Sequence, residues 1–551
     1  MPLLLLLAYA VFRTISVVYL SLILAGSVGV ILFRVKRLRE VKIGKEDVMA
    51  LLIFAITAGM IALFYAKSPI FPLLNSADFP IHLALSENFL RVRTELSSVS
   101  YPPGVHFLIG SGIQLMGLEP LVAMQRTMAV VGALAPLLIY STVYGVLRHR
   151  GAGLVAALLY LPTGIWLDGL FISGLYSNFY GNLVALSVFL LLVEYVEWGS
   201  RLRMGLLFLG GVALYLSHFT ILIFLVALWV MVPLVFFLAR PLFKALVQGL
   251  ILLTIPGVIV AAVRPNVVSL VLSIPGSSVA ESVAGVPRTA LGSLLGDVSL
   301  FLQFLYFDLH SEALFFLALI LVFATPLLVL KQRLGVWALF FCVWFFVAWA
   351  TAPSTILAWR SAYYARLPLV FVFAVGLSSI DSAVLQMWIK RPMRRHGVVL
   401  RKSRRPPRLL RSLVLLLILG VIFAGSLLPP RLSEAFGRPE GFRPYGEGVY
   451  DAVEWTRDNT LPNESLLAVG DWRLSYIGHM TGRGVSFHSF LLPDKAASLA
   501  AQGGIRFVVV SRVVFSESGG LALNLYELYK AADRFTVVWE NSVVVAFAIK
   551  A

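Results

Sequence analysis

The chain has 551 residues, of which 59% are hydrophobic and only 13% are charged, and its mean hydropathy is +0.89. A water-soluble fold cannot bury that much apolar surface, so the composition excludes a cytosolic enzyme, a disordered chain and a collagen-like protein. The net charge of +17 belongs entirely to residues 1–428, which carry 33 Lys and Arg against 15 Asp and Glu; residues 429–551 carry 12 against 13. This excess of basic residues is better explained by the orientation of membrane spans than by nucleic-acid binding. The single cysteine, Cys342, excludes an intrachain disulfide.

Apolar runs long enough to cross a bilayer recur throughout residues 1–428 and predict a polytopic α-helical membrane protein with about 12 transmembrane helices. We expect residues 102–118 to lie as a helix at the membrane interface, because a further span there would invert everything downstream. The predicted spans lie near 14–33, 48–66, 121–147, 152–167, 174–193, 204–221, 222–239, 245–263, 313–330, 334–351, 363–380 and 412–428.

Lys and Arg in the connections orient these spans. With twelve helices and an outside N-terminus, all six basic connections fall on the cytoplasmic side, as the positive-inside rule requires. These connections are 34–45, 148–150, 201–203, 240–244, 331–333 and 390–411. The same assignment predicts that 67–120, 168–173, 264–312, 352–362 and 429–551 lie on the outer side.

The last predicted span ends at Pro429 and Pro430, since proline cannot continue a helix. Beyond them, YDAVEWTRDN at 450–459 has helical apolar spacing, whereas SLLAVG, IRFVVVS and SVVVAFAI are short β-branched runs typical of buried strands. The sequence therefore predicts a transmembrane domain at 1–428 and a small extracytoplasmic α/β domain at 429–551.

The first outer loop holds the strongest candidate site. Asp78 and His82 are four residues apart and share a face if the segment is helical. His106 follows the rigid turn Tyr101-Pro-Pro-Gly104 and is a further candidate. Carboxylate and imidazole ligands together suit a divalent cation such as Mn²⁺ or Mg²⁺. The alternative is that Asp78 caps a helix and His82 packs at the interface.

Two further candidates lie near the outer ends of predicted spans. Asp168 is one, because acids at membrane depth are costly and tend to be functional; the alternative is a solvated loop carboxylate. His218 falls at a tight outer turn, where a satisfied polar group is the commoner role.

Arginines at the outer boundary could bind a lipid phosphate. Arg360 and Arg366 occur where an outer loop enters a span, and Arg126 lies near the outer start of another. Guanidinium can hold phosphate through two parallel hydrogen bonds. The alternative is that these side chains only reach toward lipid headgroups.

At these residues the chain resembles the GT-C superfamily of membrane glycosyltransferases, and distantly the catalytic subunits of archaeal oligosaccharyltransferases. Asp78, His82 and the YPPG turn are similar to the first outer loop of that family, and Asp168 to its second acid. Ser278-Val-Ala-Glu281 is similar to an S-V-S-E-type motif whose glutamate serves the metal site. Asp471 lies where the oligosaccharyltransferase tail carries its W-W-D-Y-G segment, although the tryptophan pair is missing here.

The resemblance implies transfer of a sugar from a polyprenyl-phosphate or -diphosphate donor to an acceptor at the outer face. It implies Mn²⁺ or Mg²⁺ held by Asp78, Asp168 and Glu281, with Arg360, Arg366 and Arg126 at the lipid phosphate. Asp78 could instead act as a general base. The acceptor stays open, and membrane lipids are the other expected partners. Two alternatives stay open as well, a transporter or lipid flippase and a noncatalytic scaffold; no Walker loop, H-E-x-x-H or C-x-x-C pair occurs.

Overall fold

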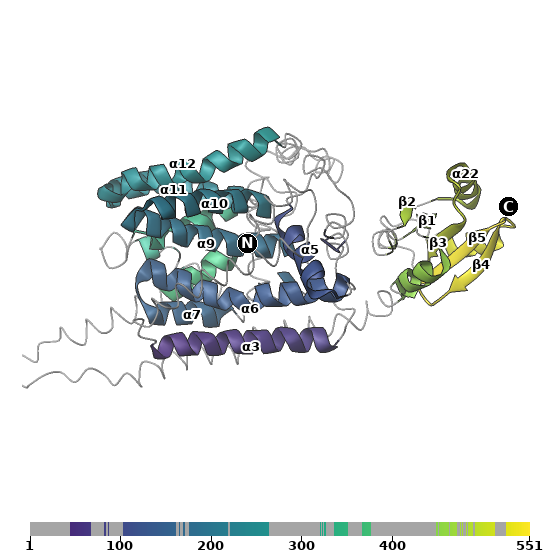
Figure 1. Ribbon diagram of the computed structural model, residues 1–551, viewed down its shortest axis with the longest axis horizontal. Coiled ribbons are helices and arrows are strands. Elements are labelled where there is room, and N and C mark those ends of the chain that lie inside the picture. The colour runs from purple at the N-terminus through teal and green to yellow at the C-terminus, as the bar shows by residue number, and fades with distance from the viewer. Residues whose placement is uncertain are drawn as a thin grey trace, which may run out of the picture.

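The computed structural model is drawn in Figure 1. It describes residues 44–67, 103–118, 120–160, 176–218, 221–263, 336–350, 366–375, 448–449, 451–461, 463–470, 483–488, 491–512 and 525–550, with isolated positions at 82–83, 86, 165, 169–170, 320, 322, 324–326, 474, 477 and 481. The predicted spans near 14–33 and 412–428, and the predicted domain boundary after residue 428, lie outside these residues.

Long apolar helices form the first part of the chain. Within the described residues, nine of the predicted spans coincide with helices, and α5 coincides with the predicted interfacial segment. Four of these helices, α3, α6, α9 and α12, are long and apolar enough to cross a membrane. The helices are α3 (Lys45–Lys67), α5 (Gly104–Met116), α6 (Pro120–Leu147), α7 (Arg150–Tyr160), α9 (Tyr176–Trp198), α10 (Arg201–Ser217), α11 (Ile221–Leu238), α12 (Arg240–Val263), α17 (Ala338–Ala350) and a helix at Arg366–Val375.

These helices pack side by side into one bundle (Figure 1). α6 contacts α3, α5, α7 and α9, while α10 contacts α9 and α12, and α17 contacts α11. Aromatic side chains fill the core between them: Phe340 stacks on Phe189 of α9 at 4.1 Å, and Phe341 on Phe371 at 4.2 Å between ring centroids. The first two turns of α5 are buried, so this helix is packed into the bundle and not only laid against it.

Two ion pairs connect helices at one end of the bundle. Arg148, just after α6, pairs with Glu197 near the C-terminus of α9 at 2.6 Å, and Arg150 at the N-terminus of α7 pairs with Asp47 near the N-terminus of α3 at 2.9 Å. Both arginines belong to a basic connection that the sequence places in the cytoplasm. The N-terminus of α9 lies at the opposite end, about 34 Å away for a helix of 23 residues.

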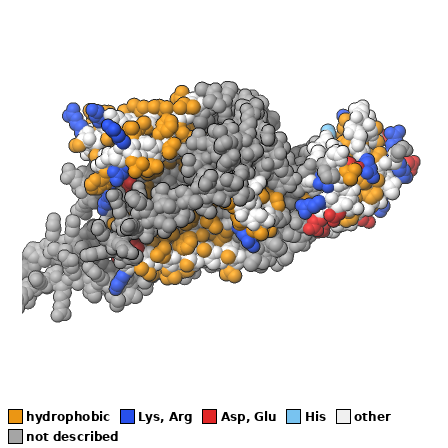
Figure 2. Space-filling model, in the orientation of Figure 1, with side chains coloured by type: hydrophobic (Ala, Val, Ile, Leu, Met, Phe, Trp, Pro, Cys, Tyr) orange, Lys and Arg blue, Asp and Glu red, His pale blue; other side chains and the backbone are white. Residues whose placement is uncertain are grey.

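Large apolar side chains cover the flank of the bundle, as Figure 2 shows. Phe237 of α11, for instance, is 79% exposed and Val258 of α12 is 65% exposed. Such a surface is stable against lipid and not against water. The chain is therefore a membrane protein.

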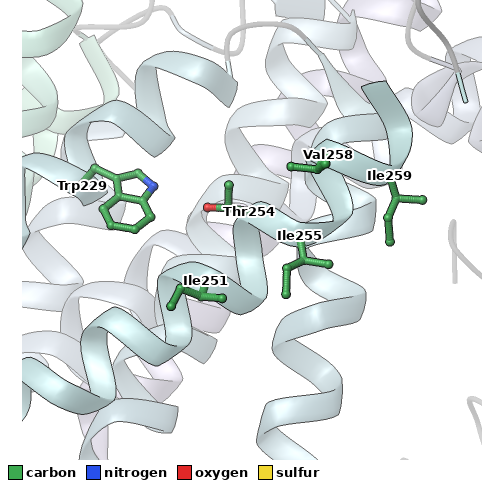
Figure 3. A pocket seen from close by; sticks show the side chains of 6 residues that line it. All are labelled: Trp229, Ile251, Thr254, Ile255, Val258 and Ile259. Carbon is green, nitrogen blue, oxygen red and sulfur yellow. The ribbon is translucent and has the colours of Figure 1, made fainter. Parts of the chain in front are cut away.

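A groove of about 290 Å³ lies on this apolar flank (Figure 3). Its one hydroxyl, on Thr254, already donates to the carbonyl of Leu250 at 2.8 Å. The exposed lining of the groove is apolar, so its surface matches a hydrocarbon chain. It is lined by Trp229 of α11 and by Ile251, Thr254, Ile255, Val258 and Ile259 of α12.

The C-terminal part of the chain forms a five-stranded sheet in the order β2-β1-β3-β5-β4. β1 pairs in parallel with β2 and β3, whereas β5 pairs antiparallel with β3 and β4. Its elements are β1 (Ser465–Val469), β2 (Gly484–His488), α22 (Pro493–Gly503), β3 (Phe507–Ser511), α23 (Leu525–Ala531), β4 (Phe535–Glu540) and β5 (Val544–Ile549).

Helices cover both faces of this sheet (Figure 1). Alternate residues of β1 point to opposite faces, so that Leu466 packs with Val453 of the helix at 451–459 and Leu467 packs with Tyr529 of α23. Burial on both faces explains why β1 and β3 are continuous apolar runs. On the edge strand β4, Val538 is an extra residue between two register positions, which makes a β-bulge.

Candidate functional site

Two buried histidines meet where α5 begins. His82 and His106 are only 4% and 0% exposed, and Nδ1 of His82 lies 2.9 Å from Nε2 of His106. One ring nitrogen donates and the other accepts, so at most one of these two atoms carries a proton at a time. The Ser86 hydroxyl donates to the carbonyl of His82 at 2.6 Å, which fits one helical turn around His82. The two histidines, which were predicted as separate candidates in one loop, are thus in direct contact.

The first residue of α9, Tyr176, packs against this histidine pair. The ring of His82 stacks on that of Tyr176, with centroids 5.5 Å apart and planes 18° apart. α5 can lie close to the end of α10 because its first residue is Gly104. A Cβ at this position would be only 2.7 Å from the carbonyl oxygen of Leu216 in α10. α5, α9 and α10 therefore bring the histidine pair and the end of α10 to one corner of the bundle.

His218 lies at the same corner. It follows the last residue of α10 in extended conformation and is 4% exposed. A Cβ on Gly181 of α9 would lie 3.3 Å from the Cβ of His218, so the two helices touch there. The sequence placed His218 at a turn between spans, and the structure adds its position beside α9.

Polar side chains that we did not predict line the first two turns of α9. Ser177, Asn178 and Asn182 are 1%, 2% and 5% exposed. The hydroxyl of Ser177, Oδ1 of Asn178 and Nδ2 of Asn182 have no hydrogen-bond partner among the described residues. The signal was present in YSNFYGN, where three small polar residues open an otherwise apolar span.

The predicted arginines have different environments. Arg366 begins the helix Arg366–Val375 and is 8% exposed, so its charge is held inside the protein. Arg126 lies on the exposed side of α6. Burial is costly for a guanidinium unless an anion or polar groups surround it. Arg366 and Arg126 thus differ in burial, and both stay predicted ligands of the lipid phosphate.

The remaining predicted site residues lie outside the described residues: Asp78, Asp168, Glu281, Arg360 and Asp471. Within the described part of the chain no group of three or more His, Cys, Asp and Glu side chains could hold a metal ion. The histidine pair alone does not fit Mn²⁺ or Mg²⁺, because these ions prefer oxygen ligands. A site for either ion would require the predicted carboxylates.

No protein-family model matches the chain, and no curated protein matches its sequence. Solved structures do match. The Archaeoglobus fulgidus oligosaccharyltransferase in the apo form has a TM-score of 0.53 at 15% identity, covering 84% of this chain and 69% of its own. The same enzyme, AglB, in complex with an inhibitory peptide and a dolichol-phosphate has a TM-score of 0.50 with the same identity and coverage. A structure of it with Zn and sulfate has a TM-score of 0.51 at 15% identity, covering 83% and 68%.

ArnT from Cupriavidus metallidurans bound to undecaprenyl phosphate has a TM-score of 0.53 at 14% identity, covering 90% of this chain and 97% of its own. AglB and ArnT are both GT-C glycosyltransferases. The resemblance to the GT-C superfamily that the sequence motifs predict is therefore confirmed at the level of the fold.

Proposed function

We propose that the protein is a membrane glycosyltransferase that takes a sugar from a polyprenyl-phosphate or -diphosphate donor. One observation carries the proposal. Buried histidines and unpaired polar side chains lie together at the corner where α5 and α9 begin. There, Nδ1 of His82 is 2.9 Å from Nε2 of His106. Polar groups are kept at such depth when they serve a substrate. The GT-C fold gives the class of reaction.

The reaction breaks the bond between the anomeric carbon and the phosphate oxygen. The acceptor's nucleophilic atom forms the new bond to that carbon, the electron pair of the broken bond stays on the lipid phosphate, and the acceptor's proton passes to a base. The transition state has oxocarbenium character. Asp78 is our candidate for the base, on the outer loop that also carries His82. Arg366, with Arg360, is proposed to stabilise the phosphate that leaves.

We also propose that Asp78, Asp168 and Glu281 bind Mn²⁺ or Mg²⁺. A divalent cation there would neutralise charge that builds up on the leaving phosphate. Asp78 cannot serve as free base and metal ligand at the same moment, so these are two versions of the site. Activity with and without Mn²⁺ separates them.

A transporter or flippase fits the described helices less well. Such a protein needs ionisable residues near the middle of the membrane. In the described helices the charged residues lie near the ends, as Asp47, Glu197 and Arg366 do. A noncatalytic scaffold gives no reason for the unpaired polar atoms of α9.

The proposal is tested with the purified full chain in lipid nanodiscs. Undecaprenyl-phosphate hexoses are supplied with peptide, lipid and glycan acceptors, and release of undecaprenyl phosphate is measured. Acceptor-dependent release is the expected result. Wild-type protein that binds neither undecaprenyl phosphate nor any of its hexose derivatives contradicts the proposal.

The extracytoplasmic position of the C-terminal domain, and the outer position of 67–120, are part of the same proposal. Cysteines introduced at Ser97 and at Ser486 should both react with an impermeant thiol reagent added outside intact cells. Cys342 is buried and serves as the internal background. Labelling of either new cysteine only after permeabilisation would overturn this topology.

A further inference from the structure

We propose that the start of α9 is a sugar-binding surface, formed by Ser177, Asn178 and Asn182, which holds hydroxyl groups of the donor's sugar. This rests on the proposed function and names the part of the donor that is recognised. The three side chains contribute three buried polar atoms that have no partner among the described residues. A buried polar atom that is left unpaired destabilises the protein, because it has lost its hydrogen bonds to water. A ligand that pairs with these atoms explains why three unpaired polar side chains occur within two turns of one helix.

The three side chains face the same way. At 100° per residue, positions 177, 178 and 182 fall within an arc of about 140° on the helix surface. Gly181 lies inside that arc, and because it has no Cβ, His218 packs closely against it, 3.3 Å from where the Cβ would be. The sugar-binding surface therefore points to the corner that holds His218, next to Tyr176 on which His82 stacks.

The chemistry of the unpaired atoms selects hydroxyl groups over phosphate. A carboxamide offers one acceptor and two donors, and a serine hydroxyl is both donor and acceptor. Oδ1 of Asn178 needs a donor, and Nδ2 of Asn182, one turn away, needs an acceptor. A sugar hydroxyl supplies both, whichever way the amides are turned. With the amide of Asn178 oriented as in the structure, an ionised phosphate, which only accepts, would leave Oδ1 of Asn178 unpaired.

The test compares two lipids on one protein. The full chain in nanodiscs is titrated with undecaprenyl phosphate and with its glucose, mannose and galactose derivatives, and dissociation constants are measured. Wild type should bind at least one glycosylated lipid more tightly than the bare lipid. Asn178→Leu and Asn182→Leu should each weaken that glycosylated lipid about tenfold, which is about 1.4 kcal/mol. Both variants should bind the bare lipid as wild type does.

A stability readout separates binding from packing. Leucine replaces an unpaired buried amide by an apolar group of similar size, so the melting temperature of the Leu variants should stay equal or rise. The matched control is Ser187→Ala on the same helix, whose hydroxyl donates to the carbonyl of Leu183 at 3.0 Å. That variant should bind both lipids as wild type does.

Four outcomes overturn the inference: equal weakening for the bare and the glycosylated lipid, a lower melting temperature in the Leu variants, unchanged binding in both, or a wild type that does not distinguish the lipids. Unchanged binding would assign these side chains to ordered water. In all four cases undecaprenyl phosphate still binds, so the proposed function survives. Wild type that binds no polyprenyl phosphate at all rejects the proposed function itself.

Discussion

The helical bundle and the sheet domain treat buried polar groups differently. In the sheet domain the hydroxyl of Tyr529 donates to the carbonyl of Leu491 at 2.9 Å, and Arg483 donates to the carbonyls of Thr460 and Thr481 at 2.7 and 2.6 Å. At the start of α9 the buried atoms of Asn178 and Asn182 are unpaired among the described residues. Among the described residues of the sheet domain, the unpaired buried atoms are Oγ1 of Thr456 and Nε of Arg512, which belong to separate elements, whereas at the start of α9 three unpaired atoms lie within two turns of one helix.

The largest expected effect falls on the sheet domain. Phe547 of β5 is fully buried against Tyr529 and Phe535. Phe547→Ala should cost about 3–5 kcal/mol of unfolding free energy, because it leaves a cavity. Hydrogen exchange of β1 and β3 measures this loss. Val538→Ala, at a side chain that is 44% exposed, is the matched control and should change little. A loss below about 1 kcal/mol in Phe547→Ala would contradict a well-packed core.

The next largest effect is expected for Asp78→Asn, which should lower turnover and leave stability unchanged. Asparagine keeps the size of the side chain but removes its charge, so transfer should fall at least about 100-fold if Asp78 is a base or a metal ligand. The melting temperature should barely move. Glu95→Gln in the same predicted outer loop is the control. Near-normal transfer by folded Asp78→Asn would leave Asp78 as a helix cap, since asparagine caps as well as aspartate.

The histidine pair should show coupling. His106→Phe keeps a ring in place but removes the 2.9 Å hydrogen bond to His82. We expect turnover to fall about tenfold, on the scale of one lost hydrogen bond of about 1.4 kcal/mol. In a double-mutant cycle with His82→Phe the two losses should not add, because each variant breaks the same contact. Strictly additive losses would mean that the histidines act separately.

The smallest effect concerns pH and the sheet domain. The backbone N–H of Leu461, and then Arg506 at 2.6 Å, lower the pKa of Glu464 below its usual value. A lowered pKa means that the stability contributed by this carboxylate is present at neutral pH and is lost as the pH falls through the folded-state pKa. Glu464→Gln should therefore cost about 0.5 kcal/mol at pH 7 and less at about pH 3. Melts of both proteins at the two pH values check this; an equal difference at both would contradict it.

Much of the fold could be predicted from local patterns. Long apolar runs predicted the described helices of the bundle, and β-branched runs predicted β1, β3 and β5, whereas neither α22 nor α23 was predicted. β2 and β4 were not predicted: GVSFH has a single β-branched residue, and the bulge at Val538 breaks the alternation in β4. α22 was missed because Ala-rich PDKAASLAAQG is only weakly apolar, although Pro493 at its start and Gly504 after its end are ordinary helix signals.

The site was harder to predict than the fold. His82 and His106 are 24 positions apart, and no spacing rule gives a contact across that distance. The contact depends on tertiary packing: α5 lies against α9 and α10, and His82 stacks on Tyr176 at the start of α9. Asn178 and Asn182 were overlooked because an asparagine in a span often forms hydrogen bonds between packed helices. Only the structure shows that Oδ1 of Asn178 and Nδ2 of Asn182 have no partner among the described residues.

The bulge at Val538 bears on how copies of this protein coexist. A membrane confines molecules to a plane, where domains on the same side collide often, and an open sheet edge invites strands of neighbouring copies to join it. At Val538 the edge strand β4 is kinked out of register, so a second β4 cannot continue the ladder along its whole length. This edge of the sheet is therefore protected from self-assembly in a crowded membrane.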